Sequence, residues 1–258
     1  MRPKYLYHYT TIDTLALILK NKTIRFNSLM NVDDLEEGKS EDLERAGAYC
    51  FISCWTNDSK ESIPLWHMYT NEMKGVRIKM PSDMFEKYDV TGPYVAESFK
   101  SYFKYEDIFR NNGIVQPGWG NILEKVIYTN DKKLLYPKVI NIHENGGEIK
   151  LNHVGIYKSE DWTFQQEWRY IIRIYPISIN EIQTKQYEKA VERLRSGRGL
   201  DIDSYFLKIK NESFEKMEIM LAPNTTEADK IIVESLVNTY NLSAKIVNST
   251  LTNKVKVK

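Results

Sequence analysis

Alternating hydrophobic and polar positions near the start of the chain predict short strands separated by a helix. Residues 5–9 and 23–26 alternate, and residues 49–55 form an apolar, aromatic run that is typical of a strand buried on both faces. Between the first two strands, apolar residues recur at helical spacing. They predict a helix for which Thr10 and Asp13 would make a capping box.

The second half of the chain repeats this mixture. The segment EWRYIIRI (residues 167–174) has the clearest strand alternation, residues 180–196 have the spacing of an amphipathic helix, and the tail predicts a strand, a helix at 226–240 and a last strand. Since strands both alternate with helices and cluster, the pattern favours an α+β fold with a mixed, largely antiparallel β-sheet core and flanking helices. No linker interrupts it, so residues 1–258 are expected to form a single α+β domain.

Composition narrows the class of protein. The 258 residues are 42% hydrophobic and 28% charged with a net charge of +1, so only a local patch could serve nucleic-acid binding. No apolar run approaches the roughly 20 residues that span a bilayer, and the start lacks an apolar signal core. Cys50 and Cys54 are the only cysteines and are expected to be reduced thiols. We therefore expect a cytoplasmic protein with no membrane contact.

His8 is the first residue that could carry chemistry. In YLYHYT it shares a strand face with Leu6 and Thr10, just before the N-terminus of the predicted helix. Ligands often bind at such places because backbone amides converge there. A histidine here can equally pack its ring and satisfy both nitrogens locally. Both interpretations stay open.

Glu167 and Tyr69 are further candidates. Alternation places Glu167 and Arg169 on the strand face opposite Trp168 and Tyr170, which are expected in the core. Glu167 is then either presented to a site or half of a weak ion pair on a solvated sheet face. Tyr69 lies on the aromatic stripe of LWHMYT, which is either core or part of a cofactor pocket, and its hydroxyl needs a partner where it is buried.

The acidic segment NVDDLEEG (residues 31–38) is dense in carboxylates that could hold a hard cation, but it lacks the ligand spacing of a calcium loop, so we favour a solvated turn. There is no zinc-type spacing of cysteine and histidine, and no metal site is expected. A metal-dependent nuclease is an alternative that rests on Glu148, Lys150 and the Asp33/Asp34 pair.

Several motifs in order resemble a bacterial domain-of-unknown-function family over nearly the whole chain. They are YHYT, TIRFNS, N-x-D-D-x-E-E, CFISCWT, LWHMYT with KGVRIKM, and EWR. More distantly, a strand with His-Tyr-Thr leading into a helix, then an aromatic helix, then a late strand carrying glutamate is similar to the ADP-ribosyltransferase fold. Enzymes with that fold use a His–Tyr–Glu-type triad around NAD.

This second resemblance implies NAD as the substrate cofactor. It makes His8 the catalytic histidine that contacts the adenosine-side ribose and Glu167 the catalytic glutamate that grips the nicotinamide ribose. Tyr69 would stack on the nicotinamide, although it falls on a predicted helix. Three further residues that flank these positions, the neighbours Tyr9 and Thr10 and the strand residue Arg169, are expected to bind the cofactor with Tyr69.

Three functions stay open. The first is an NAD-using ADP-ribosyltransferase or NAD glycohydrolase, which requires His8 and Glu167 on adjacent strands that face one cleft. The second is a non-catalytic module that binds a small-molecule ligand or another protein. The third is the nuclease, which requires Glu148, Lys150 and another carboxylate within metal-ligand reach. The acceptor of any ADP-ribose, protein or nucleic acid, is left open.

Overall fold

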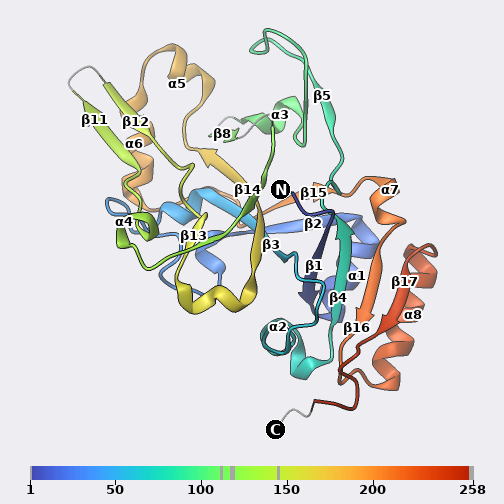
Figure 1. Ribbon diagram of the computed structural model, residues 1–258. Helices are drawn as coiled ribbons and strands as arrows, with labels where there is room; N and C mark the ends of the chain where they lie inside the picture. Colours follow the sequence, from blue (N-terminus) through green and yellow to red (C-terminus); the bar gives the residue numbers. More distant parts are fainter. Residues whose placement is uncertain (1, 111–112, 117–119, 144–145, 256–258) are drawn as a thin grey trace.

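The computed structural model describes residues 2–110, 113–116, 120–143 and 146–255 and confirms the α+β fold (Figure 1). Within these residues the main sheet has eleven strands, antiparallel except for β16 and β17, so the sheet is mixed and largely antiparallel as predicted. Along its main path the order is β17 (Lys245–Asn248), β16 (Glu218–Leu221), β4 (Val76–Pro81), β1 (Tyr5–Thr10), β3 (Cys50–Thr56), β14 (Glu167–Tyr175), β8 (Gly113–Gln116) and β7 (Phe109–Arg110); β2 (Thr23–Ser28) joins β3 and β15 (Ser204–Lys208), and β9 (Leu123–Lys125) joins β14.

The sheet forks beside β3. One edge of β3 pairs with β14 along its whole length. The other edge is divided, because β1 meets it at Thr56 whereas β2 meets it at Phe51 and Ile52. Residues 53–55 have no partner strand on that edge in the described chain, and the sheet therefore opens between β1 and β2.

The connection from β1 to α1 (Ile12–Asn21) differs by one residue from the predicted capping box. Thr11 is the N-cap, and its side chain accepts a hydrogen bond from the backbone N of Thr14 at 3.2 Å. Thr10 stays in β1, so the expected Thr10–Asp13 box is wrong. The helix buries Leu15 and Leu19, as their spacing predicted, and it also buries Ile18.

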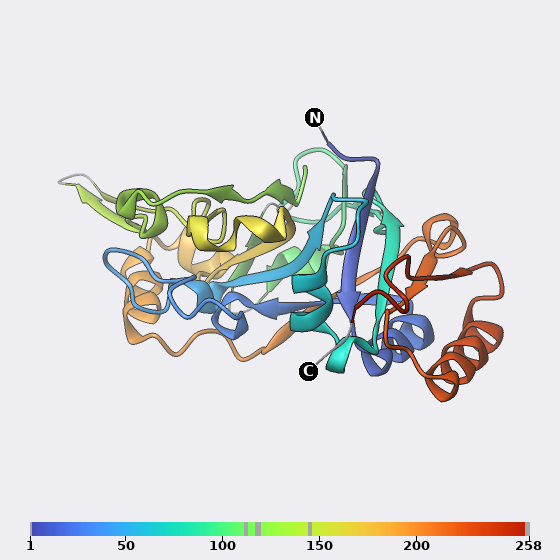
Figure 2. The ribbon, with the colours of Figure 1, turned by 60° about the horizontal axis from the view of Figure 1, so that its bottom comes forward.

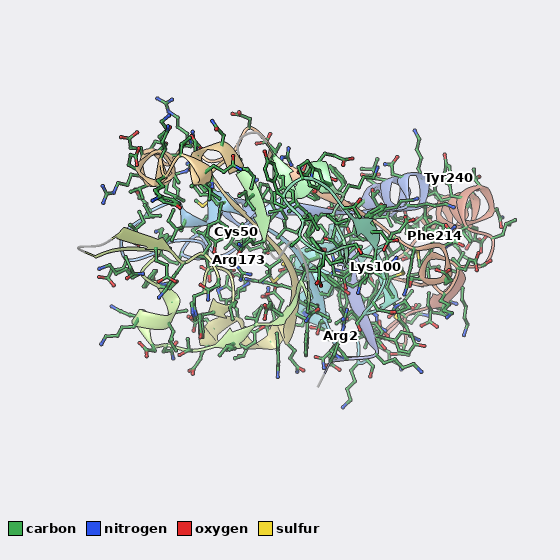
Figure 3. The ribbon with its side chains drawn as sticks, turned by 90° about the horizontal axis from the view of Figure 1, so that it is seen from above. Arg2, Cys50, Lys100, Arg173, Phe214 and Tyr240 are labelled. Atoms are coloured by element: carbon green, nitrogen blue, oxygen red, sulfur yellow. The ribbon has the colours of Figure 1, made fainter. Side chains whose placement is uncertain are left out.

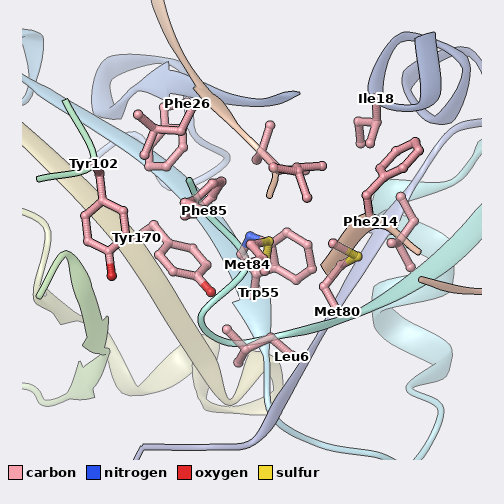
Figure 4. Packing of buried hydrophobic residues seen from close by; sticks show 14 of the residues in the cluster. Leu6, Ile18, Phe26, Trp55, Met80, Met84, Phe85, Tyr102, Tyr170 and Phe214 are labelled. Carbon is pink, nitrogen blue, oxygen red and sulfur yellow. The ribbon is translucent and has the colours of Figure 1, made fainter. Parts of the chain in front are cut away.

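The largest core cluster lies where α1 and α8 (Glu227–Tyr240) pack on one face of the sheet and extends under β14 (Figure 4). Trp55 and Tyr170 meet edge to face with ring centroids 6.3 Å apart. Tyr170 is 1% exposed, as expected for the core. Trp168 packs against the same cluster but is only half-buried, so its assignment to the core holds in part.

A second cluster covers the other face of β3 and β14, and it includes Ile52, Ile171 and Leu194. Cys50 lies opposite Arg173 in this region (Figure 3). Since Phe51 belongs to the first cluster and Ile52 to the second, β3 is buried on both faces as predicted.

A third, small cluster forms where α2 (Ile63–Tyr69) packs beside β1 (Figure 2). Ser62 caps the helix, and Pro64 lies in its first turn, where a missing N–H costs nothing. Trp66 is fully buried, and the chain after β17 packs against the cluster through Leu251 and Val255. This packing fixes the helix that carries Tyr69.

Two predictions of secondary structure were wrong in detail. The helix expected at 180–196 is two helices, α5 (Ile179–Gln183) and α6 (Tyr187–Ser196), with a break at Lys185, whose φ is +58°. The glycine, proline and asparagine content of residues 111–121 predicts a loop, but this segment contains β8, and part of it lies outside the described residues. The NGG sequence at 145–147 predicts a turn, and its Asn145 also lies outside the described residues. The other elements are β5 (Tyr88–Val90), β6 (Phe99–Ser101), α3 (Tyr105–Ile108), β10 (Ile127–Tyr128), α4 (Lys132–Leu135), β11 (Ile140–His143), β12 (Gly146–Ile149), β13 (Tyr157–Lys158) and α7 (Asn211–Phe214).

Among the helices that the structure describes, none is both long enough and apolar enough to cross a membrane.

Candidate functional site

Two hollows lie at the fork of the sheet, one of about 70 Å³ and one of about 470 Å³. Five residues line both of them: His8, Tyr9, Cys54, Tyr69 and Glu167. They come from β1, β3, α2 and β14, which are far apart in sequence. The structure therefore brings the sequence-predicted residues His8, Tyr69 and Glu167 to one cleft. The expectation that His8 and Glu167 lie on adjacent strands is wrong, because β3 lies between β1 and β14.

The side chain of His8, on β1, bonds to β3 across the fork. Its Nδ1 lies 2.8 Å from the backbone carbonyl oxygen of Cys54. A carbonyl oxygen only accepts, so Nδ1 carries the proton, and in the neutral ring Nε2 is an acceptor. Burial lowers the pKa of His8, which favours this neutral form. Among the described residues Nε2 has no hydrogen-bond partner, so it can accept one from a ligand.

Glu167 is held as a buried anion at the start of β14. Arg169 Nε lies 2.6 Å from one carboxylate oxygen, and Arg169 Nη2 and Lys158 Nζ lie 2.9 and 3.4 Å from the other. Burial alone would raise the pKa of Glu167, but the charges of Arg169 and Lys158, with hydrogen bonds from Arg169 and Cys54, lower it to about 2. Glu167 is 4% exposed, so the solvated-face interpretation of this pair is wrong.

Arg169 is fully engaged within the protein. Its five N–H groups have five acceptor oxygens: two of Glu167, two of Glu37 and the carbonyl of Gly155, the last at 3.0 Å. Lys158 Nζ lies 3.4 Å from Glu37 and completes a cluster of two carboxylates and two cations. Arg169 lines only the larger hollow and is 0% exposed. Its donors therefore position Glu167, and none is free for a cofactor.

Tyr69 is fixed through its hydroxyl. It accepts a hydrogen bond from Gln165 Nε2 at 2.8 Å, and Gln165 Oε1 accepts one from Lys158 at 2.8 Å. Burial, followed by the charge of Asp33 and a hydrogen bond to it, raises the pKa of Tyr69 well above its ordinary value. The hydroxyl is thus neutral, and it is coupled through Gln165 to the cluster around Glu167.

Tyr9 and Thr10 also line the cleft, but their contacts differ from those of His8, Tyr69 and Glu167. The Tyr9 hydroxyl accepts hydrogen bonds from the backbone N of Ser62 at 3.0 Å and from Arg77 at 3.4 Å, so it anchors the start of α2. Its ring still lines both hollows, whereas Thr10 lines only the larger one. The larger hollow continues along α1 and β2, where carboxamide, hydroxyl, guanidinium and aromatic side chains line it: Asn21, Asn27, Asn31, Thr14, Thr23, Arg25 and Phe206.

The residues that position Glu167 and Tyr69 were not identified from the sequence; they are Glu37, Lys158 and Gln165. Glu37 belongs to the segment expected to be a solvated turn; Asp33 and Glu36 there are exposed, but Glu37 is buried against Arg169. Lys158 and Gln165 lie in a region without clear periodicity. The one available signal was the proximity of Gln165 to Glu167, two positions before it in the chain.

The residues on which the nuclease alternative rests do not lie at one site. Glu148 pairs with Lys150 at 2.9 Å on a hairpin where its side chain is 56% exposed. It lines a hollow beside α6, whereas Asp33 lines the larger hollow of the cleft. Within the residues that the structure describes, no group of three or more histidine, cysteine, aspartate or glutamate side chains is arranged to hold a metal ion.

Comparison of the chain with protein-family models, with curated proteins and with solved structures found no match.

Proposed function

We propose that the chain uses NAD as a substrate and transfers or hydrolyses its ADP-ribose. The observation that carries the proposal is that His8, Tyr69 and Glu167 line one cleft at the fork of the sheet. A neutral acceptor, a fixed aromatic residue and a permanent anion are the three groups that such chemistry needs.

The reaction breaks the bond between the nicotinamide nitrogen and ribose C1′, and nicotinamide leaves with the bonding electrons. Positive charge then develops on the ribose, and an attacking oxygen or nitrogen forms the new bond to C1′ and loses its proton to solvent. A fixed carboxylate stabilises that charge more in the transition state than in the ground state. Glu167 fits this role because its pKa of about 2 keeps it ionised at neutral pH.

The other groups would orient the substrate. Tyr69 offers an aromatic face to the nicotinamide, and Nε2 of His8 accepts a hydrogen bond from a ribose hydroxyl. The smaller hollow, at about 70 Å³, is too small for a dinucleotide, so the adenosine half would lie in the larger one along α1 and β2. Holding both halves reduces the entropy cost of reaching the reactive geometry.

The first experiment measures whether NAD binds and whether nicotinamide is released. NAD should raise the melting temperature of the protein, since a ligand of the native state alone stabilises it. Chromatography should then detect free nicotinamide. His8→Ala is expected to weaken the NAD-dependent shift and to slow release, because the acceptor Nε2 is lost.

A second candidate, a non-catalytic ligand-binding module, is favoured by one observation. Arg169 and Lys158 already contact both carboxylate oxygens of Glu167, so the carboxylate has little capacity left for a substrate hydroxyl. On this alternative NAD or another small ligand would raise the melting temperature, but no nicotinamide would be released.

A further inference from the structure

One row of side chains crosses the sheet from Glu167 towards its far edge. Glu167 lies opposite Thr56, Thr56 opposite Tyr7, Tyr7 opposite Lys79, and Lys79 opposite Glu218. Residues directly opposite one another point to the same face of a sheet. Since neighbouring strands lie about 4.8 Å apart, Tyr7 is about 10 Å from Glu167 across the sheet. The face that carries Glu167 thus continues onto β1 and β4.

Part of this face is uncovered. The helices α1 and α8 pack on the opposite face; in Figure 1, α1 lies behind β4, and α8 lies at the edge of the sheet beside β17. On the near face, α2 and the chain after β17 cover the end marked by Tyr9 and Met220. Beyond that end, Tyr5 and Tyr7 are half-buried and the Lys79 side chain is 29% exposed. Arg77 lies opposite Tyr9 and Met220 at the covered end and is buried. We call Tyr5, Tyr7 and Lys79 the tyrosine strip.

A cation lies beside each ring of the tyrosine strip. The ammonium of Lys79 lies 5.0 Å from the ring centroid of Tyr5, and the guanidinium of Arg77, which is buried, lies 4.7 Å from that of Tyr7. Two positions apart on one strand, the tyrosines are about 7 Å from each other. Exposed Lys4 adds a cation 5.4 Å from Tyr5, so cations outnumber the one carboxylate that faces Lys79.

This chemistry fits a single-stranded nucleic acid. Bases stack on tyrosine rings whatever their sequence, and phosphates pair with accessible cations, here Lys79 and Lys4. A folded protein partner would need a larger complementary apolar patch, which two tyrosines and two long cationic side chains do not provide. Tyr7 also lines the smaller hollow, so a strand lying on the strip leads directly to the cleft.

We propose that the tyrosine strip binds single-stranded nucleic acid and presents a base to the cleft as the acceptor of ADP-ribose. The acceptor role rests on the proposed function, whereas the binding does not. In the transfer, a base nitrogen or oxygen bonds to ribose C1′ as the nicotinamide bond breaks, and the proton of the acceptor goes to solvent.

The test measures fluorescence anisotropy of a labelled ten-nucleotide oligothymidylate as a function of salt. The parent should bind, and Tyr5→Ala should weaken binding about tenfold, the effect of losing one base stack. Tyr5→Phe, which keeps the ring, should bind like the parent. Lys79→Gln should reduce the slope of log affinity against log salt by about 0.7, the effect of one lost phosphate contact.

Matched controls lie on the separate β5–β6 hairpin. Tyr94→Ala and Lys100→Gln make the same chemical changes at residues that are 51% exposed and, for the lysine side chain, 62% exposed. Neither should change binding. Binding lost equally in these controls, binding that survives Tyr5→Ala, or equal competition by polyglutamate would overturn the proposal.

A second readout separates this inference from the proposed function. Transfer of label from NAD to the oligonucleotide would support both. Nicotinamide release without oligonucleotide binding would refute nucleic-acid binding by the tyrosine strip but would support the proposed function. Oligonucleotide binding without nicotinamide release would support binding by the strip but would refute both its acceptor role and the proposed function.

Discussion

Replacing Glu167 by glutamine is expected to cost about 3 kcal/mol of unfolding free energy at pH 7. The pKa of Glu167 falls from its ordinary value of 4.5 to about 2 in the folded protein. At about 1.4 kcal/mol for each pKa unit, ionised Glu167 favours folding by that amount. Glutamine keeps the shape but not the charge, and it leaves Arg169 paired only with Glu37. Near-isosteric replacement is therefore not neutral here.

The sign of the pH dependence makes this prediction specific. A carboxyl group whose pKa is lower in the folded state stabilises the protein above its unfolded pKa, and that contribution is lost as pH falls towards the folded value. The difference between parent and Glu167→Gln should therefore be full at pH 7 and shrink towards zero between about pH 4.5 and pH 2.

Urea denaturation at several pH values measures this difference. Glu148→Gln is the matched control, because its pair with Lys150 is on the surface, and it should change stability by less than about 0.5 kcal/mol. A loss below about 1 kcal/mol for Glu167→Gln at pH 7, or a loss that does not change with pH, would refute the reasoning.

Three further predictions concern a core residue, a glycine after α2 and a thiol that lines the cleft. Tyr170→Phe removes the hydroxyl that donates to the Ser82 carbonyl at 2.7 Å, so urea denaturation should show a loss of about 1–3 kcal/mol; a change within 0.5 kcal/mol would contradict the bond. Gly75→Ala places a methyl group 2.2 Å from the Thr10 carbonyl oxygen and should cost about 1–3 kcal/mol, whereas an unchanged melting temperature would show that the backbone yields. Burial raises the pKa of the Cys54 thiol, so Ellman's reagent should label it only after unfolding; rapid labelling of the folded protein would contradict this.

The strands around the site could be predicted because each buries at least one face. Alternation identified β1 and β14, and it placed Tyr170 in the core correctly. It could not show that the opposite face of β14 is also buried, since the covering residues Glu37 and Lys158 come from segments without periodicity. The break at Lys185 was missed for a related reason, because spacing does not reveal a left-handed backbone conformation.

The meeting of His8 and Glu167 depends on strand order, which a single sequence does not encode locally. They share a cleft because β3 pairs with β14 on one edge and only partly with β1 on the other. Across the fork, His8 bonds to the backbone carbonyl of Cys54, and side-chain types alone do not predict such a bond. The choice of His8 and Glu167 as one site was consequently a hypothesis from resemblance.

Nicotinamide release from NAD by the parent and by Glu167→Gln tests the central claim most directly. The comparison is made at pH 7 and at a temperature where near-ultraviolet circular dichroism shows both proteins to be folded, so lost stability is not mistaken for lost chemistry. Because the charge of Glu167 would act on the transition state, the variant should release nicotinamide slower by orders of magnitude while it still binds NAD. Equal release by the two folded proteins, or no release by the parent, would contradict the account.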